Sequence, residues 1–354
     1  MITSINLGLD WGRGNFKVAG PQGTTWLPSH VAHASGDLRR AEAGVRIAQP
    51  QYDIQFDADG SSAHYYVGHN APLTGTAIEA LDLTDYTGAL DQRALLYAAI
   101  TEYFKKFNLT SSPNAPLTAK VSVGVPQKAL VGEDAAPRKT AIRQWLTATH
   151  TWDAKGTTGQ PQTYCLVIDK VGVASQAVGA LFYYMTNPDR SYRTGVIDAL
   201  LAKPLGILSL GSSTLELMGV QMRDTGRSRV PEILPDLEGS YSVGAYHMLN
   251  MSDSMQSWSL GYRDQQFRTN PKTHDTEIGN WLRQVQGQIN QRWSGQVHRD
   301  FAGVFVVGGM LRVPQVREWV RKQFRNAVIA GYDLGEQEDD CITAISQGLY
   351  RQIG

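Results

Sequence analysis

Three glycine-containing turns each follow an apolar, strand-like run, and they carry the residue types that hold phosphates. The turns lie at residues 10–17, 209–214 and 307–310. Glycine lets the backbone approach an anion without a clashing Cβ, and successive N–H groups form a concave nest of donors. One such turn is weak evidence, because glycine turns are common. Two of them in separate halves of the chain, with a late Gly–Gly turn, favour a nucleotide held between two lobes.

We expect all three turns to contribute nucleotide contacts. The candidates are Gly12, Arg13, Gly14, Asn15, Lys17, Ser209, Gly211, Ser212, Ser213, Thr214, Gly308, Gly309 and Met310. Other nucleotide-binding patterns do not fit the sequence. No Gly-x-x-x-x-Gly-Lys-Ser/Thr run occurs, and the glycine pair of the first turn lacks the third glycine of a dinucleotide-binding fingerprint.

The elements that would position these turns alternate between strand and helix. Apolar strand-like runs precede the turns, and residues 117–125 form a further buried strand that Pro126 ends. Helical periodicity or helix signals predict helices at residues 91–107, 133–149, 175–185, 243–256, 276–293, 313–326 and 339–352. This alternation predicts an α/β fold. The strand–turn pattern of residues 5–19 partly recurs at residues 205–220. Two similar lobes that face one cleft would explain this recurrence.

The ordered motifs resemble those of the actin-like ATPase superfamily, and most closely its ParM/StbA-like branch of plasmid-segregation and archaeal proteins. Residues 8–18 resemble the first phosphate motif of that family. The other matching segments fall in the family's order: residues 65–71, 123–126, the connecting helix at 176–180, the second phosphate motif at 207–216 and the adenosine motif at 306–310. Each motif alone is loose, but the ordered set is specific and spans nearly the whole chain.

The resemblance implies an actin-like fold with two related lobes, built on ribonuclease H-like cores, around a nucleotide cleft. Domain I would comprise residues 1–170 and 338–354, and domain II residues 171–337, with a smaller subdomain near 221–275. The ligand would be ATP, or GTP, with Mg²⁺. The implied function is an ATPase that polymerises head to tail into nucleotide-dependent filaments, for plasmid or DNA segregation or another cytoskeletal task.

The family's functional positions fall on three residues of this chain. By the resemblance, Asp10 would hold the metal, Gln176 would position the attacking water and Lys17 would offset phosphate charge. The sequence departs from the family where Ser209 and Glu216 replace two aspartates. A neutral hydroxyl at position 209 supplies no charge, so Mg²⁺ would rely on Asp10 and the phosphates. We therefore expect slow hydrolysis, with nucleotide binding less affected.

Each of these residues also has a simpler interpretation. Asp10 could cap its own turn, Lys17 could be a solvated strand lysine, and Gln176 could be an ordinary first residue of a helix. Two other functions also fit the motifs. A small-molecule kinase of the same superfamily would need a catalytic aspartate that we do not find in the sequence. A nucleotide-binding scaffold with little turnover would suit the loss of charge at Ser209.

Composition limits the partners that we expect. Lys plus Arg and Asp plus Glu number 33 each, so no overall basic field favours nucleic acid or an anionic membrane. A DNA contact would therefore pass through a DNA-bound adaptor. Two cysteines, no export signal and no apolar span of about 18 residues indicate a cytoplasmic protein. Three arginines close in sequence form either a patch for DNA or a partner, such as the acidic run 336–340 of a neighbouring copy, or a solvated face: Arg223, Arg227 and Arg229.

Overall fold

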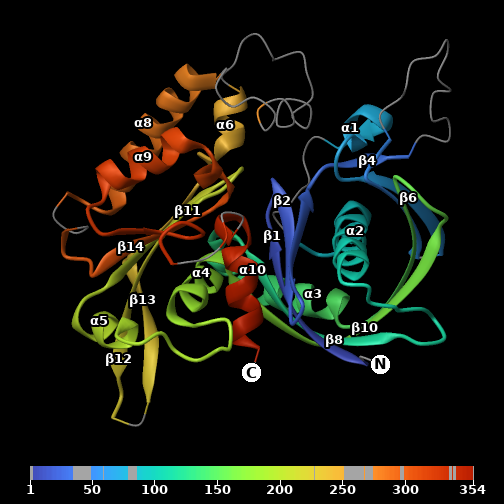
Figure 1. The fold of residues 1–354 in the computed structure, drawn as a ribbon, viewed down its shortest axis with the longest axis horizontal. Coiled ribbons are helices and arrows are strands. Elements are labelled where there is room, and N and C mark those ends of the chain that lie inside the picture. Colours follow the sequence, from blue (N-terminus) through green and yellow to red (C-terminus); the bar gives the residue numbers. More distant parts are fainter. Residues whose placement is uncertain are drawn as a thin grey trace.

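Two β-sheets, each with helices packed against it, form the molecule in the computed structural model (Figure 1). The structure describes residues 3–34, 49–58, 60–78, 86–226, 228–250, 267, 274–295, 299–334, 337 and 340–353. Within these residues the larger sheet has ten strands and the smaller has five. We call the part built on the larger sheet the first lobe and the part built on the smaller sheet the second lobe. The α/β prediction is confirmed.

The larger sheet has the order β3-β2-β1-β8-β10-β9-β5-β6-β4-β7. Its strands are β1 (Ser4–Trp11), β2 (Asn15–Gly20), β3 (Gly23–Pro28), β4 (Val31–His33), β5 (Tyr52–Ala58), β6 (Ser61–Val67), β7 (Thr76–Ala77), β8 (Leu117–Val125), β9 (Thr149–Gly156) and β10 (Gln162–Ser175). The smaller sheet has the order β13-β12-β11-β14-β15. Its strands are β11 (Leu205–Leu210), β12 (Leu215–Asp224), β13 (Arg229–Tyr241), β14 (Gly303–Val307) and β15 (Ala327–Ile329).

The two sheets share a duplicated core. In each, an antiparallel hairpin (β1–β2 or β11–β12) continues antiparallel into a third strand, β3 or β13. On its other side, β1 pairs in parallel with β8, and β8 pairs in parallel with β10. In the smaller sheet β11 pairs in parallel with β14, and β14 with β15, in the same way. The order β3-β2-β1-β8-β10 thus matches β13-β12-β11-β14-β15. The recurrence noticed between residues 5–19 and 205–220 is therefore a structural repeat.

The helices mostly follow the sequence expectations. They are α1 (Ala71–Thr74), α2 (Leu90–Lys106), α3 (Ala135–Leu146), α4 (Gln176–Met185), α5 (Val196–Ala202), α6 (Ala245–Asn250), α8 (Asp275–Arg292), α9 (Pro314–Gln323) and α10 (Asp340–Gln352), with short 3₁₀ turns η2 (Gln127–Leu130) and η6 (Gly309–Arg312). The expected helix at 313–326 ends earlier, because β15 begins at residue 327. Of the helix expected at 243–256, residues 251–256 lie outside the described part of the chain.

Helices α4 and α10 cross between the two lobes, as Figure 1 shows. The crossing is close because it is built on glycines: a Cβ added to Gly348 would overlap the carbonyl oxygen of Gly179. On its other side α10 lies against β1, where a Cβ on Gly8 would overlap the backbone oxygen of Ser346. The buried Arg351 guanidinium also donates to the carbonyl oxygen of Thr186, at 2.7 Å. The helix pair therefore joins the lobes through backbone contact.

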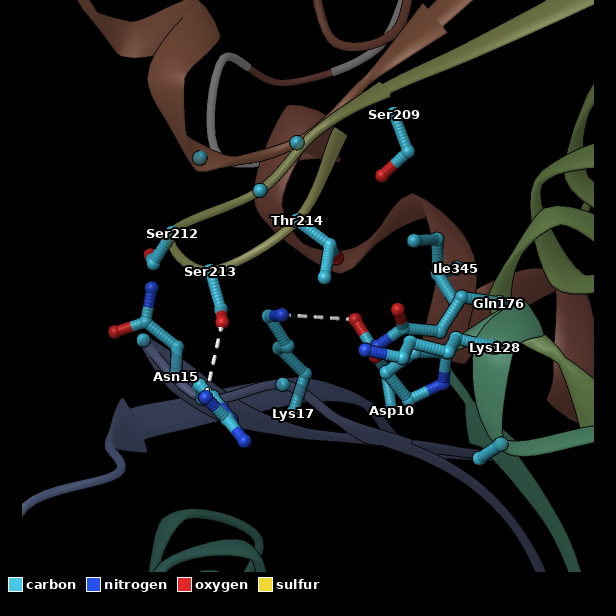
Figure 2. Close-up of a pocket in the computed structure, with 18 of the residues that line it drawn as sticks. Asp10, Asn15, Lys17, Lys128, Gln176, Ser209, Ser212, Ser213, Thr214 and Ile345 are labelled. Atoms are coloured by element: carbon cyan, nitrogen blue, oxygen red, sulfur yellow. Dashed lines mark hydrogen bonds and ion pairs between the residues drawn. The ribbon is translucent and has the colours of Figure 1, made fainter. Parts of the chain in front are cut away.

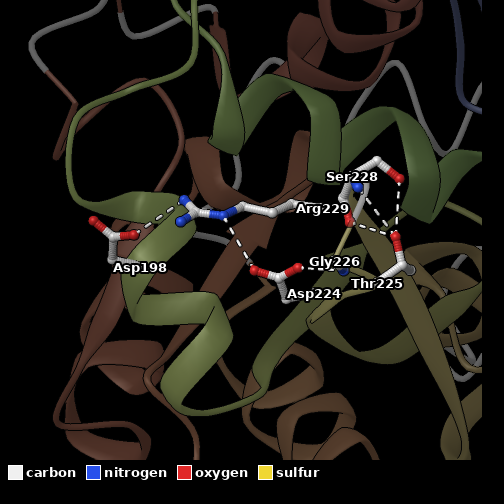
Figure 3. A network of polar contacts seen from close by, with 6 residues as sticks. All are labelled: Asp198, Asp224, Thr225, Gly226, Ser228 and Arg229. Carbon is white, nitrogen blue, oxygen red and sulfur yellow. Dashed lines mark hydrogen bonds and ion pairs between the residues drawn. The ribbon is translucent and has the colours of Figure 1, made fainter.

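Two arginines of the cluster, Arg223 and Arg229, lie on the β12–β13 hairpin, and Figure 3 shows the contacts of Arg229. Arg229 forms ion pairs with Asp198 of α5, at 3.3 Å, and with Asp224, at 3.9 Å. Arg223 lies 3.5 Å from Glu232 on the neighbouring strand. Arg227 lies outside the described residues. The two described arginines are largely exposed and have acidic neighbours on the same surface, so they fit the interpretation of a solvated face.

Candidate functional site

The three residues expected to carry chemistry meet at the end of β1 (Figure 2). Asp10 is fully buried, and it lies directly opposite Lys17 in the β1–β2 pairing. Directly opposed residues of an antiparallel pair point to the same face of the sheet. The Lys17 ammonium lies 2.8 Å from Asp10 Oδ2, and Gln176 Nε2 donates to Asp10 Oδ1 at 2.6 Å. The buried carboxylate is thus hydrogen-bonded at Oδ1 by α4 and ion-paired at Oδ2 with β2, while Oδ2 has no hydrogen-bond partner among the described residues.

The first turn is held in place by its own backbone. Ser29 Oγ donates to the carbonyl oxygen of Gly12 at 2.6 Å. A Cβ at Gly12 would lie 2.8 Å from the carbonyl oxygen of Asn15, so only glycine fits the turn without a shift. Arg13 reaches the other lobe, where its guanidinium donates to Ser213 Oγ at 3.3 Å. The first turn therefore faces the second across a narrow gap.

The second turn, residues 211–214, is fixed from behind by the segment that starts α6. The N–H groups of Gly244 and Tyr246 donate to the carbonyl oxygens of Ser213, at 3.1 Å, and Ser212, at 2.7 Å. A Cβ at Gly244 would overlap the backbone of both serines. This packing uses the carbonyl side of the turn. It leaves the hydroxyls of residues 212–214 on the pocket side, where Figure 2 shows them.

The third turn joins β14 to η6. Gly308 has a φ of 118°, and a Cβ there would overlap the carbonyl of Leu210, so the position requires glycine. Its N–H donates to the carbonyl oxygen of Cys341 at 2.9 Å, which ties the turn to α10. Gly308 and Gly309 both line the pocket. Met310 does not: its side chain is buried in the hydrophobic core of the second lobe, because η6 turns it away from the cleft.

Between the lobes the three turns surround one pocket, with an empty volume of about 1080 Å³ that includes space open to solvent. Apart from Met310, every residue expected to contact a nucleotide lines it, together with Asp10 and Gln176. The lining residues that sequence reasoning missed are Tyr86, Pro126, Lys128, Ala129, Arg138, Ser242, Ile342 and Ile345. Lys128 and Arg138 follow the end of β8, and strand ends in α/β folds commonly border ligand sites. That signal was present in the sequence.

Glu216 is the second acidic group near the floor of the pocket. It lies directly opposite Ser209 in the β11–β12 pairing and is fully buried. Its Oε1 accepts the backbone N–H of Gln127, at 2.9 Å, so this contact spans the two lobes. Burial raises the pKa of Glu216 to about 7; the Gln127 N–H opposes the rise and the nearby Asp10 charge adds to it. This carboxyl therefore binds a proton more readily than an exposed glutamate does.

A metal ion in this pocket would need the phosphates of a bound nucleotide as ligands, in addition to the protein. Among the described residues no group of three His, Cys, Asp or Glu side chains could form a protein cage. Mg²⁺ does not need one, since it usually keeps several waters and binds one or two carboxylates with substrate phosphates. The single carboxylate of Asp10, beside the anion-binding turns, fits that mode of binding.

A comparison with models of known protein families finds a match. Residues 8–179 match the family described as "Actin like proteins N terminal domain". Residues 8–179 thus belong to the actin-like protein family. The matched region begins at Gly8 of β1 and ends in α4, so it contains the first turn, Asp10, Lys17 and Gln176. A comparison with curated protein sequences gives no match.

Solved structures match the actin-like protein over its full length. A 15-stranded ParM filament from Clostridium botulinum is 12% identical, with a TM-score of 0.69 over 99% of this chain and 98% of that one. An archaeal actin homologue in complex with ADP is 16% identical, with a TM-score of 0.66 over 98% of both chains. The actin-like protein Alp7A is 14% identical, with a TM-score of 0.65 over 98% of this chain and 95% of that one. These matches confirm the predicted actin-like fold.

A search of the described helices for a membrane span finds none that combines sufficient length with sufficient apolar character.

Proposed function

We propose that this actin-like protein binds ATP with Mg²⁺ in the cleft between its lobes and polymerises into filaments in response. The observation that carries the proposal is the pocket itself. Glycine turns from both lobes of a duplicated core face one space, with the buried pair Asp10–Lys17 at its floor. A ligand that contacts both lobes stabilises one relative arrangement of them, which is how nucleotide state could control assembly.

The residues of the cleft have distinct proposed roles. The backbone and hydroxyls of residues 12–14 and 211–214 hold the phosphates, and Gly308 and Gly309 allow close approach of the adenosine. Bound Mg²⁺ would neutralise developing charge on the phosphates. Lys17 adds positive charge near the phosphates, and Gln176 orients the attacking water from the start of α4. Since Ser209 offers no carboxylate, we expect hydrolysis to be slow.

Self-association and cellular role are proposed from the family. The matched structures include a ParM filament and an Alp12 filament. We propose a head-to-tail contact, because a heterologous contact that does not close generates an open filament. The proposed role is plasmid or DNA segregation in the cytoplasm, through a DNA-bound adaptor. We place domain I at residues 1–170 and 338–354 and domain II at 171–337.

High-speed pelleting with negative-stain microscopy tests the proposal. Purified protein is mixed with Mg²⁺ and ATP, GTP, ADP or a nonhydrolysable analogue, and phosphate release is followed in the same tubes. We expect filaments with the triphosphate and slow release of phosphate. If no polymer forms at any concentration and ADP appears without free phosphate, only when a phosphate-accepting small molecule is added, the protein is a kinase instead.

The loss of charge at position 209 favours one further candidate, a nucleotide-binding scaffold with little turnover. The same tubes separate it from the first proposal. A scaffold would form polymer with ATP or with the nonhydrolysable analogue equally, and the polymer would persist while no phosphate is released.

A further inference from the structure

Tyr86 occupies a constrained position just before α2. Its φ is 48°, a left-handed conformation that non-glycine residues rarely adopt. Trp145 Nε1 donates to the Tyr86 carbonyl oxygen at 2.7 Å, and the Trp11 ring lies edge-on to the Tyr86 ring, with centroids 5.9 Å apart. Gly88 completes the turn, since a Cβ there would lie 2.6 Å from the Trp145 ring. The packing therefore holds a strained backbone so that the phenol points inward.

The Tyr86 hydroxyl is buried and has no hydrogen-bond partner among the residues that the structure describes. Tyr86 nevertheless lines the pocket, with Asp10 and Gln176. A buried tyrosine hydroxyl usually finds a partner, and leaving it unpaired destabilises the folded state. An unpaired buried donor beside a ligand pocket thus calls for a ligand or a bound water.

A matching acceptor borders the pocket on the side of the second lobe. Glu216 lies opposite Ser209, which lines the pocket, and its Oε1 accepts the N–H of Gln127, whose two chain neighbours also line it. Glu216 Oε2 is also buried without a partner in the described part of the chain. Burial raises the pKa of Tyr86 well above its usual value; Arg13 opposes the rise, and the charges of Glu216 and Asp10 add to it. The phenol therefore stays protonated and can donate.

We propose that the Tyr86 hydroxyl and Glu216 Oε2 hold a water molecule at the inner end of the pocket, and that Tyr86 positions this water for attack on the terminal phosphate. The hydroxyl donates to the water oxygen, and the water donates one hydrogen to Oε2. A buried water needs two to four polar partners, and the third is on the pocket side, near Gln176. A phosphate oxygen fits less well there, because two carboxylates would repel it.

This inference rests on the proposed nucleotide hydrolysis, but it concerns a residue that the family motifs do not include. Tyr86 is a positioning residue, since it contacts the water and neither gains nor loses a proton. Removing it should change the rate constant of hydrolysis and leave nucleotide binding alone. A purely structural hydroxyl would behave differently, because an unsatisfied buried group only lowers stability.

The test compares Tyr86→Phe with Tyr103→Phe in the full-length protein. Tyr103 is also a buried tyrosine of the first lobe, but its hydroxyl donates to Gln22 Oε1 at 2.8 Å and lies outside the pocket. Phosphate release is measured over a range of ATP concentrations, and thermal unfolding is measured with and without ATP. For Tyr86→Phe we expect kcat to fall at least tenfold, with KM and the ATP-induced rise in Tm unchanged. For Tyr103→Phe we expect a lower Tm and an unchanged kcat.

Three results would overturn the inference. One is a Tyr86→Phe protein with the kcat of the wild type. Another is a parallel loss of kcat and of ATP-induced stabilisation, which would mean that the hydroxyl contacts the nucleotide or supports the fold. The third is a wild-type protein that is stabilised by ATP but releases no phosphate. A wild-type protein that ATP does not stabilise at all would instead refute the proposed function, so the two failures are distinguishable.

Discussion

The equivalent hairpins of the two lobes show how a duplicated backbone can acquire two chemistries. In β1–β2 the opposed pair is Asp10 and Lys17, whose charged groups are in contact. In β11–β12 the opposed pair is Ser209 and Glu216. The acidic residue is therefore on the second strand of this hairpin, where Glu216 accepts the backbone N–H of Gln127 from the other lobe. The shared fold fixes where the side chains point, while the residue types decide which lobe supplies charge and which supplies hydroxyls and a link between lobes.

The largest effect that we predict comes from the charged hairpin. Asp10→Asn keeps the shape of the side chain but removes its charge and leaves the Lys17 ammonium without an anion. Phosphate release should fall about 1000-fold, equivalent to about 4 kcal/mol of transition-state stabilisation. Asp198→Asn, which removes an exposed carboxylate on α5, is the matched control. Equal rates for the two variants would mean that Asp10 is only a turn residue.

The second hairpin should control how stability depends on pH. The pKa of Glu216 is about 7 in the folded chain against an ordinary value of 4.5. Between these values the folded state holds one more proton than the unfolded state, so stability falls as pH rises, by about 3 kcal/mol in total. In Glu216→Gln this contribution should vanish, since the amide cannot ionise. Urea unfolding of the nucleotide-free protein at pH 5, 6, 7 and 8 measures it, and parallel curves for the two proteins would contradict the assignment.

Making the second hairpin more like the first should have an intermediate effect. Ser209→Asp places a carboxylate opposite Glu216 on the wall of the pocket. With Mg²⁺ and ATP we expect phosphate release to rise about tenfold, because a charged group would help to hold the metal and its waters. Without nucleotide the variant should be less stable, since the new charge is buried. Ser209→Asn serves as the uncharged control; if both variants release phosphate at the same rate, charge at position 209 is not what limits hydrolysis.

The smallest effect should come from the tip of the second lobe. Arg229 pairs with Asp198 and Asp224, but all three side chains are at least half exposed. Exposed ion pairs contribute less than about 1 kcal/mol. Arg229→Ala should therefore leave the free energy of unfolding and phosphate release almost unchanged. A strong loss of filament pelleting in this variant would show instead that the hairpin contacts a neighbouring molecule.

Sequence reasoning worked best where local signals were strong. Residues 117–125 were expected as a strand and are β8 with the same bounds, because apolar residues alternate along them and Pro126 follows. The apolar run expected before the third turn is β14. The three-residue strand β15 was missed: it begins just after the helix expected at 313–326 and was assigned to no element. So short a strand has no periodicity of its own, and only pairing with β14 makes it a strand.

In the candidate site, too, some residues could be predicted from local signals and others could not. Glycine turns and the residues within them could be read from the sequence, because phosphate binding by a turn is a local property of the backbone. Met310 could not be placed, since the direction of one side chain after a glycine pair depends on how η6 packs. Tyr86 had no signal at all: its hydroxyl reaches the pocket only because Trp11 and Trp145, distant in sequence, hold its turn.

By itself, the sequence determined several of the strands, where the glycine turns lie, and that two halves of the chain repeat one pattern. Each of these depends on neighbouring residues, through apolar periodicity and the conformational freedom of glycine. Only the tertiary structure decided that Gln176 reaches Asp10 and that Glu216 bridges the lobes to Gln127. These contacts join residues 166 and 89 positions apart, and only the packing of the two lobes around α4 and α10 brings them together.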